Sequence, residues 1–452
     1  MDRSLGALTR LAAALAGLVL AAAGAPAAAA DDPGPALAGT PVTGTPTEAR
    51  APALATGRYL DRLPARGSLH YRLPRTATGS TFHVAVMFVG SGGSVGEGVR
   101  VQVGTTPGDQ GCGSGGVFRP TVGEPAPVLF TGLTTWTDVE DHPCAVATEL
   151  YLSVGEPDED ADAGRPMEIL VYEEPPLSAY GLDLLPTPEP VPWTAQRPAR
   201  RPRDVPAGTT PTNAPVVGDG TYALTLRPGR TRVLAVPLDW DQTLQAQLDT
   251  RLPAGVPTPE GIAVDVVSPL LGTSERPFTA DRPADWRVPG TDGGRLRTGA
   301  QSQVVSYANR NSYDASITTE ALAGIHYVLV RWTGTGNAAG PDVPATLTLR
   351  TTGVPGDGVP SYTPVDGLIG PQPASRLVDG TLQAPVATAP ERAPRTDDDP
   401  LLSRRTLVAG GGVAALLLVV LLGRARRHSR NHPHAGAARP LSHHERGGRH
   451  RG

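Results

Sequence analysis

Apolar and polar residues alternate in many short segments of this chain, and this pattern limits the fold more than any other feature of the sequence. In "TFHVAVMF", residues 81–88, Phe82, Val84 and Val86 occupy every second position. Side chains two positions apart lie on the same face of a strand, so such a segment buries one face in a core. Gly, Pro and Asp turns separate the segments, and the region between the two chain ends has no helical periodicity of useful length. The pattern predicts an all-β protein.

The alternating segments occur twice in the same order. A Gly-x-Tyr segment opens each copy, "GRYLDRL" from position 57 and "GTYALTL" from position 220. A turn with Pro and Gly follows, then "SLHYRLP" or "TRVLAVP", and then "TFHVAVMF" or "TLQAQLD", which match after a slip of one residue. A tyrosine-bearing segment and a final alternating segment close each copy. We therefore expect a duplicated domain, with two tandem jelly-roll or β-sandwich folds; the alternative is that unrelated extracellular β-domains share these patterns.

This order of segments resembles the bacterial pre-peptidase C-terminal (PPC) domain, a jelly-roll-like accessory module of secreted proteins. The resemblance covers roughly residues 55–177 and 217–353, on short motifs, and the whole layout is similar to surface proteins of actinobacteria. It implies a non-catalytic module that assists, targets or binds, and it carries over no site residue. The first copy departs from the family in having Cys112, Cys144 and the Gly-rich stretch "GTTPGDQGCGSGG".

The beginning of the chain is typical of a secretory signal peptide. Residues 1–30 contain Arg3 and Arg10, an apolar run, and then the small residues "APAAAA", with cleavage expected near Ala30. An uncleaved membrane anchor is the alternative. We expect the mature N-terminus, residues 31–54, to be disordered because it is rich in Pro, Thr and Ala.

A second apolar segment, residues 406–423, predicts a transmembrane helix. It has no charged residue and would span about 27 Å as a helix, close to the thickness of the bilayer core. Three arginines follow within four residues, and the tail, residues 424–452, is rich in Arg and His. The positive-inside rule places this basic tail in the cytoplasm. The sequence thus predicts a single-pass type I protein of the cell membrane with its bulk outside; a buried helix of a soluble protein is the alternative.

Two Pro-rich segments lie between the predicted parts. Residues 178–216 are expected to be an extended linker between the sandwiches at 55–177 and 217–353. Residues 354–405, rich in Pro, Gly and Thr, are expected to be a stalk that lifts the domains off the membrane.

Cys112 and Cys144 are the two cysteines of the chain, and both fall in the part predicted to be exported. An even number of cysteines in an oxidising compartment favours a disulfide. The bridge would close a loop of about 32 residues and stabilise the domain by roughly 3–4 kcal/mol. Two free or metal-bound thiols are the alternative.

The acidic loop "EPDEDADAG" is the best candidate for a metal site. Asp158, Asp160 and Asp162 alternate, as hard oxygen ligands for Ca²⁺ often do, and Gly164 would permit a tight loop. The loop lacks the glycine and glutamate that an EF-hand requires at its sixth and twelfth positions, where Ala163 and Ile169 stand. A solvated acidic turn is therefore the alternative to a calcium site.

The sequence contains no motif that identifies an enzyme. "GCGSGG" around Ser114 is faintly similar to the glycine motifs of serine hydrolases, but it matches neither GxSxG nor GDSGG. His70, His83 and His326 lie within strand-like runs, and there is no zinc-binding motif or P-loop. Trp136 and Trp240 stand beside Asp, where they could stack on sugars or contact a partner; packing in a core is the alternative.

These features together predict a membrane-anchored extracellular binding or scaffold protein that acts at the cell envelope. The expected partner is a cell-envelope polymer or another membrane protein. A cell-surface hydrolase, or an accessory subunit of a secreted peptidase, remains the alternative. The basic tail is expected to contact anionic lipid, with metal binding by its histidines as a second possibility, and no folded module for nucleic acid is present in the sequence.

Overall fold

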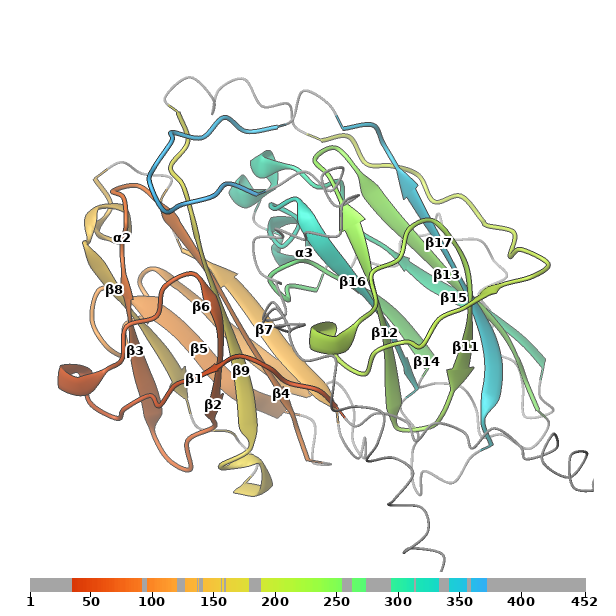
Figure 1. Cartoon of the computed structure of the whole chain (residues 1–452), viewed down its shortest axis with the longest axis horizontal. Helices are drawn as coiled ribbons and strands as arrows, with labels where there is room; N and C mark the ends of the chain where they lie inside the picture. Colours follow the sequence, from red (N-terminus) through yellow and green to blue (C-terminus); the bar gives the residue numbers. More distant parts are fainter. Residues whose placement is uncertain are drawn as a thin grey trace, which may run out of the picture. The chain divides into compact units, whose positions relative to one another are not determined.

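Strands dominate the structure, a computed structural model (Figure 1). It describes residues 35–371, except 92–95, 120–126, 136, 138–140, 156, 158–159, 179–187, 254–261, 274–293, 313, 333–340 and 356–358. The strands form four sheets, so the prediction of an all-β protein is confirmed. The helical elements have three to five residues each: η1 (Glu48–Arg50), α2 (Pro143–Val146), η2 (Asp160–Asp162), η4 (Pro211–Asn213), η5 (Tyr307–Asn311) and α3 (Ala315–Thr318).

The first half of the described chain forms two sheets that enclose one core. The five-stranded sheet has the order β1 (Thr40–Pro41), β2 (Gly57–Arg62), β9 (Pro166–Glu174), β4 (Thr81–Val89) and β7 (Val128–Thr134). The four-stranded sheet has the order β3 (Ser68–Pro74), β8 (Glu149–Gly155), β5 (Gly96–Gly104) and β6 (Gly113–Arg119). Phe82, Val84 and Val86 of β4 belong to the same buried cluster as Val101 and Leu152 of the facing sheet. This is the layering of a β-sandwich.

The second half repeats this arrangement. Its five-stranded sheet has the order β10 (Arg203–Asp204), β11 (Gly220–Leu226), β17 (Val343–Thr352), β13 (Thr243–Leu252) and β15 (Gly294–Gln301). Its three-stranded sheet has the order β12 (Arg230–Leu238), β16 (Gly324–Trp332) and β14 (Ile262–Val267). Strand for strand, the order matches that of the first half, and only β6 lacks a counterpart among the described residues.

The repeat begins before the Gly-x-Tyr segments. Thr40 of β1 pairs in parallel with Tyr59, and Arg203 of β10 pairs in parallel with Tyr222, so both strands shift by 163 positions (203 minus 40, and 222 minus 59). Two isolated bridges on β3 recur on β12 with the same shift. The two halves therefore share an N-terminal edge that the alternation of apolar residues does not reveal.

This edge changes the boundaries expected from the sequence. Residues 40–54, expected to be disordered, form β1, η1 and bridges to β3, and residues 203–216 of the expected linker do the same beside β12. The composition of these two segments does not indicate that they are folded. The first strand of a sheet offers unpaired backbone groups, and a short Thr- and Pro-containing segment can satisfy them without alternating apolar side chains.

A third apolar cluster joins the two halves. Ala85 and Met87 point away from the core of the first sandwich and belong to one buried cluster with Val233, Tyr327 and Leu329 of the second. We call this contact, formed by the outer faces of β4, β7 and β9 and the outer faces of β12, β14 and β16, the junction. Both halves belong to one compact unit. The central strands on each side of the junction are consequently buried on both faces.

The chain returns to the first sandwich after β17. Thr363 N–H donates to Pro176 O at 2.8 Å, and Tyr172 O–H donates to Ile369 O at 2.7 Å. Residues 359–371, which we call the return segment, lie within the stretch expected to be a stalk, 354–405. Their contacts place the beginning of that stretch on the folded unit.

The predicted disulfide is confirmed. Cys112 and Cys144 are bridged, with 5.4 Å between their Cα atoms, and both side chains are buried in the core of the first sandwich. Cys112 directly precedes β6 and Cys144 lies in α2, so the bridge fastens an edge strand to the loop before β8.

The predicted signal peptide (1–30), transmembrane helix (406–423) and basic tail (424–452) lie outside the described residues. Among the residues that are described, no helix has the length and apolar character needed to cross a bilayer.

Candidate functional site

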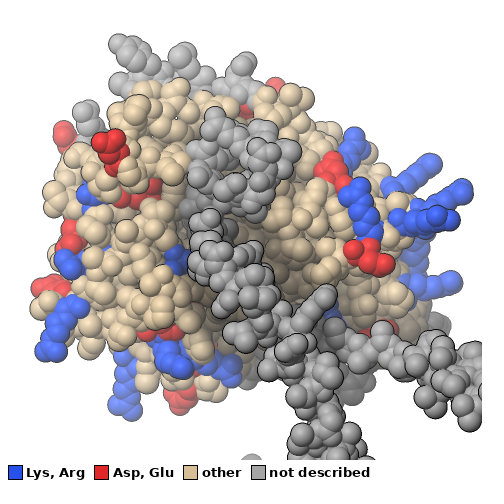
Figure 2. All heavy atoms as spheres, in the orientation of Figure 1, with Lys and Arg blue, Asp and Glu red and all other residues tan. Residues whose placement is uncertain are grey.

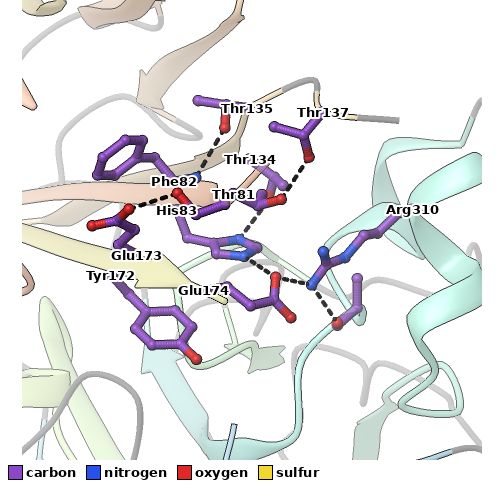
Figure 3. A network of polar contacts seen from close by, with 12 residues as sticks. Thr81, Phe82, His83, Thr134, Thr135, Thr137, Tyr172, Glu173, Glu174 and Arg310 are labelled. Atoms are coloured by element: carbon purple, nitrogen blue, oxygen red, sulfur yellow. Dashed lines mark hydrogen bonds and ion pairs between the residues drawn. The ribbon is translucent and has the colours of Figure 1, made fainter. Parts of the chain in front are cut away.

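The polar contacts at one end of the junction begin with His83 on β4 and Glu174 at the end of β9. His83 pairs with Tyr172 across the two strands, and its ring stacks on the tyrosine with 5.7 Å between the ring centroids. His83 Nε2 lies 2.8 Å from Glu174 Oε2, and both side chains are almost completely buried. A histidine within one apolar strand and a glutamate at the end of another thus satisfy each other (Figure 3).

The protonation state of His83 follows from its surroundings. Burial lowers the pKa of His83 below its ordinary value of 6.5, although the Glu174 carboxylate opposes this effect. The imidazole is therefore neutral at pH 7. Because Nε2 faces a carboxylate, it carries the proton and donates, and Nδ1 accepts from Thr134 Oγ1 at 2.9 Å. A hydroxyl, an imidazole and a carboxylate form a continuous chain from β7 to β9.

Arg310 of η5 brings the second sandwich to the same carboxylate. Its Nη2 lies 2.5 Å from Glu174 Oε2, and its guanidinium stacks 3.8 Å from the centroid of the Tyr307 ring. Tyr362 of the return segment donates to Glu174 Oε1 at 2.6 Å. One carboxylate therefore contacts the first sandwich, the second sandwich and the return segment.

The charges of this group are fixed over the physiological range. Burial alone would raise the pKa of Glu174, but Arg310 and His83 outweigh it and hold that pKa below its ordinary value. Burial likewise disfavours the Arg310 cation, yet the Glu174 carboxylate more than compensates and raises the pKa of Arg310. An ionised Glu174 and a protonated Arg310 form a buried pair, which is costly to break because the remaining charge would have no counter-ion.

A second polar contact crosses the junction at the other end of β9. Glu168 Oε1 lies 2.9 Å from Arg58 Nη1, and Glu168 Oε2 accepts from Thr212 of η4 at 2.7 Å. Burial raises the pKa of Glu168, and the positive charge of Arg58 offsets part of this rise. Burial also raises the pKa of Tyr327, to about 12. The junction is thus apolar in its middle and hydrogen-bonded at both ends.

A cavity of about 300 Å³ lies beside Arg310. Residues of both sandwiches line it, including Thr81, Thr134 and Thr137 from the first and Thr319 from the second. Ser114 also lines the cavity and is exposed, so the cavity is open to solvent. Its volume lies at the lower end of the range typical of small-molecule sites.

The acidic loop does not assemble a metal site in the part of the chain that is described. Asp162 is buried in η2, where Oδ1 accepts from Ser91 N–H at 2.5 Å and lies 3.3 Å from Arg165 Nε. Asp160 is the first residue of the same turn, where its backbone carbonyl accepts from Ala163 N–H, and Asp158 lies outside the described residues. The described residues contain no group of three or more His, Cys, Asp or Glu that could hold a metal ion. Calcium binding by this loop stays a prediction.

The other candidate residues from the sequence lie in different parts of the structure. No hydrogen bond joins Ser114 to a histidine among the described residues, although Ser114 lines the cavity. Trp240 is buried in the core of the second sandwich, where the packing interpretation predicted it. Trp136 lies outside the described residues. His326, like His83, is completely buried and lies 2.6 Å from a glutamate, Glu320.

The residues that make up the site were only partly visible in the sequence. The sequence places His83 in a strand-like run, but it does not mark Glu174 or Arg310 as site residues. One signal was present: "VYEEP" places two carboxylates at the end of an apolar strand, and buried carboxylates need a counter-charge. The sequence did not indicate which of 40 basic residues would supply it.

Figure 2 shows that uncharged residues form most of the face in view. Basic side chains gather along its right edge, and basic and acidic side chains are mixed over the left part.

Comparisons with known proteins give no family. No protein-family model matches the sequence, and a search of curated proteins found no match.

Several solved structures have remote similarity to the fold. A protein from Parabacteroides distasonis, described as secreted, is 9% identical, with a TM-score of 0.16 over 66% of this chain and 89% of its own. The CUB1-EGF-CUB2 part of human MASP-1/3 is 9% identical, with a TM-score of 0.15 over 65% of this chain and 99% of its own. The ANX1 ectodomain from Arabidopsis thaliana is 12% identical, with a TM-score of 0.16 over 65% and 85%. Likeness at these scores carries no argument about function.

Proposed function

We propose that the protein is a non-catalytic binding or scaffold protein of the cell envelope, and that the cavity beside Arg310 is its ligand site. The observation that carries this proposal is the composition of the cavity wall, in which Ser and Thr hydroxyls predominate and Arg310 supplies a charge. Such groups recognise a polar ligand by hydrogen bonds. The titratable pair His83 and Glu174 lies behind the wall, bonded to each other.

The proposal includes an extracellular location. The disulfide between Cys112 and Cys144 supports it, because such bridges persist in oxidising compartments. The apolar segments at 1–30 and 406–423 support export and a single-pass anchor, with the basic tail inside the cell. In this proposal two PPC-like jelly rolls present the cavity to a cell-envelope polymer or to a membrane protein partner.

One observation favours the alternative of a surface hydrolase. Thr134, His83 and Glu174 form a hydroxyl–imidazole–carboxylate chain, and Thr134 lines the cavity. In a catalytic triad the carboxylate serves the imidazole, whereas here Glu174 also binds Arg310 and Tyr362 and holds the junction together. We therefore propose that the hydrogen-bonded series Thr134–His83–Glu174 stabilises the junction and does not catalyse a reaction. The test of the proposed function must exclude hydrolysis.

Co-sedimentation with isolated cell envelopes tests the proposal. The full chain, purified in detergent, is expected to bind envelope polymer that remains chemically unchanged, and a Ser114→Phe variant, which fills the cavity, is expected to lose this binding. The matched control is Val146→Phe, an exposed position that is not among the described residues lining the cavity. Release of polymer fragments, or labelling by a hydrolase probe that a Thr134→Val variant abolishes, would show an enzyme instead. Equal binding by the two phenylalanine variants would rule out the cavity as the ligand site.

A further inference from the structure

We propose that the cavity takes a small hydroxylated carboxylate, such as a sugar acid, and that Arg310 holds its carboxylate group. This inference rests on the proposed function, because it names the ligand of the same cavity. Three properties of the described residues carry it: the unused hydrogen-bonding capacity of Arg310, the distribution of charge around the cavity, and the chemistry of its wall.

Arg310 has donors that the protein leaves unused. Its polar contacts, to Glu174 Oε2 and to Ala321 O at 3.4 Å, are both made by Nη2. Nε is buried and has no hydrogen-bond partner among the described residues. Nη1 makes no hydrogen bond to a described residue either, so its two N–H groups can donate to a carboxylate in the cavity. The side chain is 6% exposed and held by its stack on Tyr307, so its remaining donors are preorganised.

The charge facing the cavity is positive. Arg310 is the only charged residue among the seventeen described residues of the lining, and Glu174 is not part of that lining. A ligand in the cavity would therefore contact Arg310, the cation of the buried ion pair. The carboxylate of Glu174, which does not line the cavity, offsets part of the charge of Arg310. One partly balanced cation suits a singly charged carboxylate better than a phosphate dianion.

The wall suits the rest of a sugar acid. Nine of the seventeen described lining residues are Ser or Thr. The hydroxyls of Thr81 and Thr137 lie 2.6 Å apart and share one hydrogen bond, which leaves one of the two O–H groups able to donate to a ligand. Leu133, Leu270 and Leu322 provide an apolar side against which the C–H face of a ring can pack. A cavity of about 300 Å³ has room for one sugar ring.

Calorimetric titration of the full chain in detergent tests the inference with four small probes. Glucuronate has both the carboxylate and the hydroxyls, glucose lacks the carboxylate, acetate lacks the hydroxyls, and inorganic phosphate carries more charge. We expect glucuronate to bind at least tenfold more tightly than any of the other three, because only it uses the guanidinium and the hydroxyl wall together.

Two variants locate the binding. Arg310→Lys keeps the charge next to Glu174 but removes the Nη1 donors, because its single nitrogen is held by Glu174, and it is expected to weaken glucuronate binding at least tenfold. Ser114→Phe leaves the Glu174 contacts intact and is expected to abolish binding by filling the cavity. The matched control is Arg331→Lys, in which the arginine pairs with the buried Asp265 but does not line the cavity; its binding should equal that of the wild type.

The outcomes separate this inference from the proposed function. Equal binding of glucose and glucuronate, tighter binding of phosphate, or full retention of glucuronate binding by Arg310→Lys would overturn the carboxylate assignment. If no probe binds at millimolar concentration while the chain still co-sediments with cell envelopes, the inference fails and the proposed function stands. If both experiments fail, the proposed function fails with it.

Discussion

At the scale of single residues, the structure is organised around Glu174. This carboxylate accepts a hydrogen bond from His83, pairs with Arg310 and accepts a second hydrogen bond from Tyr362, so it touches three parts of the chain that are distant in sequence. Loss of the carboxylate charge would leave Arg310 buried without a counter-ion. The residue therefore matters more to stability than its position at the end of a strand suggests.

Glu174→Gln is accordingly expected to lower the free energy of unfolding by about 3–5 kcal/mol, the usual cost of breaking a buried ion pair from one side. The matched control is Asp342→Asn, which breaks an exposed pair with Arg227 and should cost less than about 1 kcal/mol. Urea unfolding followed by fluorescence measures both. Similar losses in the two variants would contradict the central place given to Glu174.

The same group makes the protein sensitive to acid. The pKa of His83 is lowered by burial, so below about pH 6.5 the unfolded chain binds a proton at this site that the folded chain resists. The pKa of Glu174 is also lowered in the folded state, so its stabilisation is present above its ordinary pKa and is lost as the pH falls through the folded value. Both effects lower the free energy of unfolding as the pH falls.

We therefore expect the unfolding free energy to fall as the pH is lowered from 7 to 4, with the first decline below pH 6.5. In His83→Gln, which cannot titrate, the decline between pH 6.5 and 5 should be smaller than in the wild type. Urea titrations at a series of pH values measure the slope. A wild-type stability that rises toward acid would disprove the assignment of a neutral His83.

At the scale of elements, the close contact of β7 with the second sandwich depends on a glycine. A Cβ built on Gly132 would lie 1.9 Å from Leu270 O, a backbone atom that cannot rotate away. Gly132→Ala is expected to destabilise the junction by about 1–3 kcal/mol, as overpacking does elsewhere. Hydrogen exchange of peptides from β7 and β16 should report faster opening.

Gly218→Ala is the matched control, because nothing lies within 4 Å of a Cβ at that position. Its unfolding free energy should change by less than about 0.5 kcal/mol. Unchanged exchange in Gly132→Ala would mean that the two sandwiches do not pack in this way in solution.

Strands were more predictable than the way in which they stack. Alternation locates β3, β4 and β13, because a strand facing one core shows a period of two. The same alternation hides the junction, since in "TFHVAVMF" it points only to the face of Phe82, Val84 and Val86. Strands buried on both faces read as nearly continuous apolar runs, and "VAVMF", "ILVY" and "YVLV" carry that signal.

The site was less predictable for a physical reason. Glu174 and Arg310 are 136 positions apart (310 minus 174), and no periodicity links a strand end to a 3-10 turn in another domain. A buried histidine could be suspected from its place in an apolar strand, as for His83 and His326. Its partner could not, because a counter-charge is chosen by the packing of whole sheets rather than by local sequence.

At the scale of the whole molecule, the disulfide is the largest covalent constraint on the first sandwich. Serine at both Cys112 and Cys144 is expected to lower the unfolding free energy by about 3–4 kcal/mol, because the bridge closes a loop of 32 residues. The second sandwich, which has no cysteine, should be unaffected in its own hydrogen exchange. Denaturant unfolding with and without reductant measures the loss, and identical stability in the two conditions would contradict it.

The return segment has a mechanical consequence. After β17 the chain hydrogen-bonds to Pro176 and Tyr172 before it continues toward its C-terminal end. Tension applied from that end would act first on these hydrogen bonds and on the contact of Tyr362 with Glu174, and only then on β17. A pull on the C-terminal end of the return segment would thus load the contacts at the junction before it reaches β17.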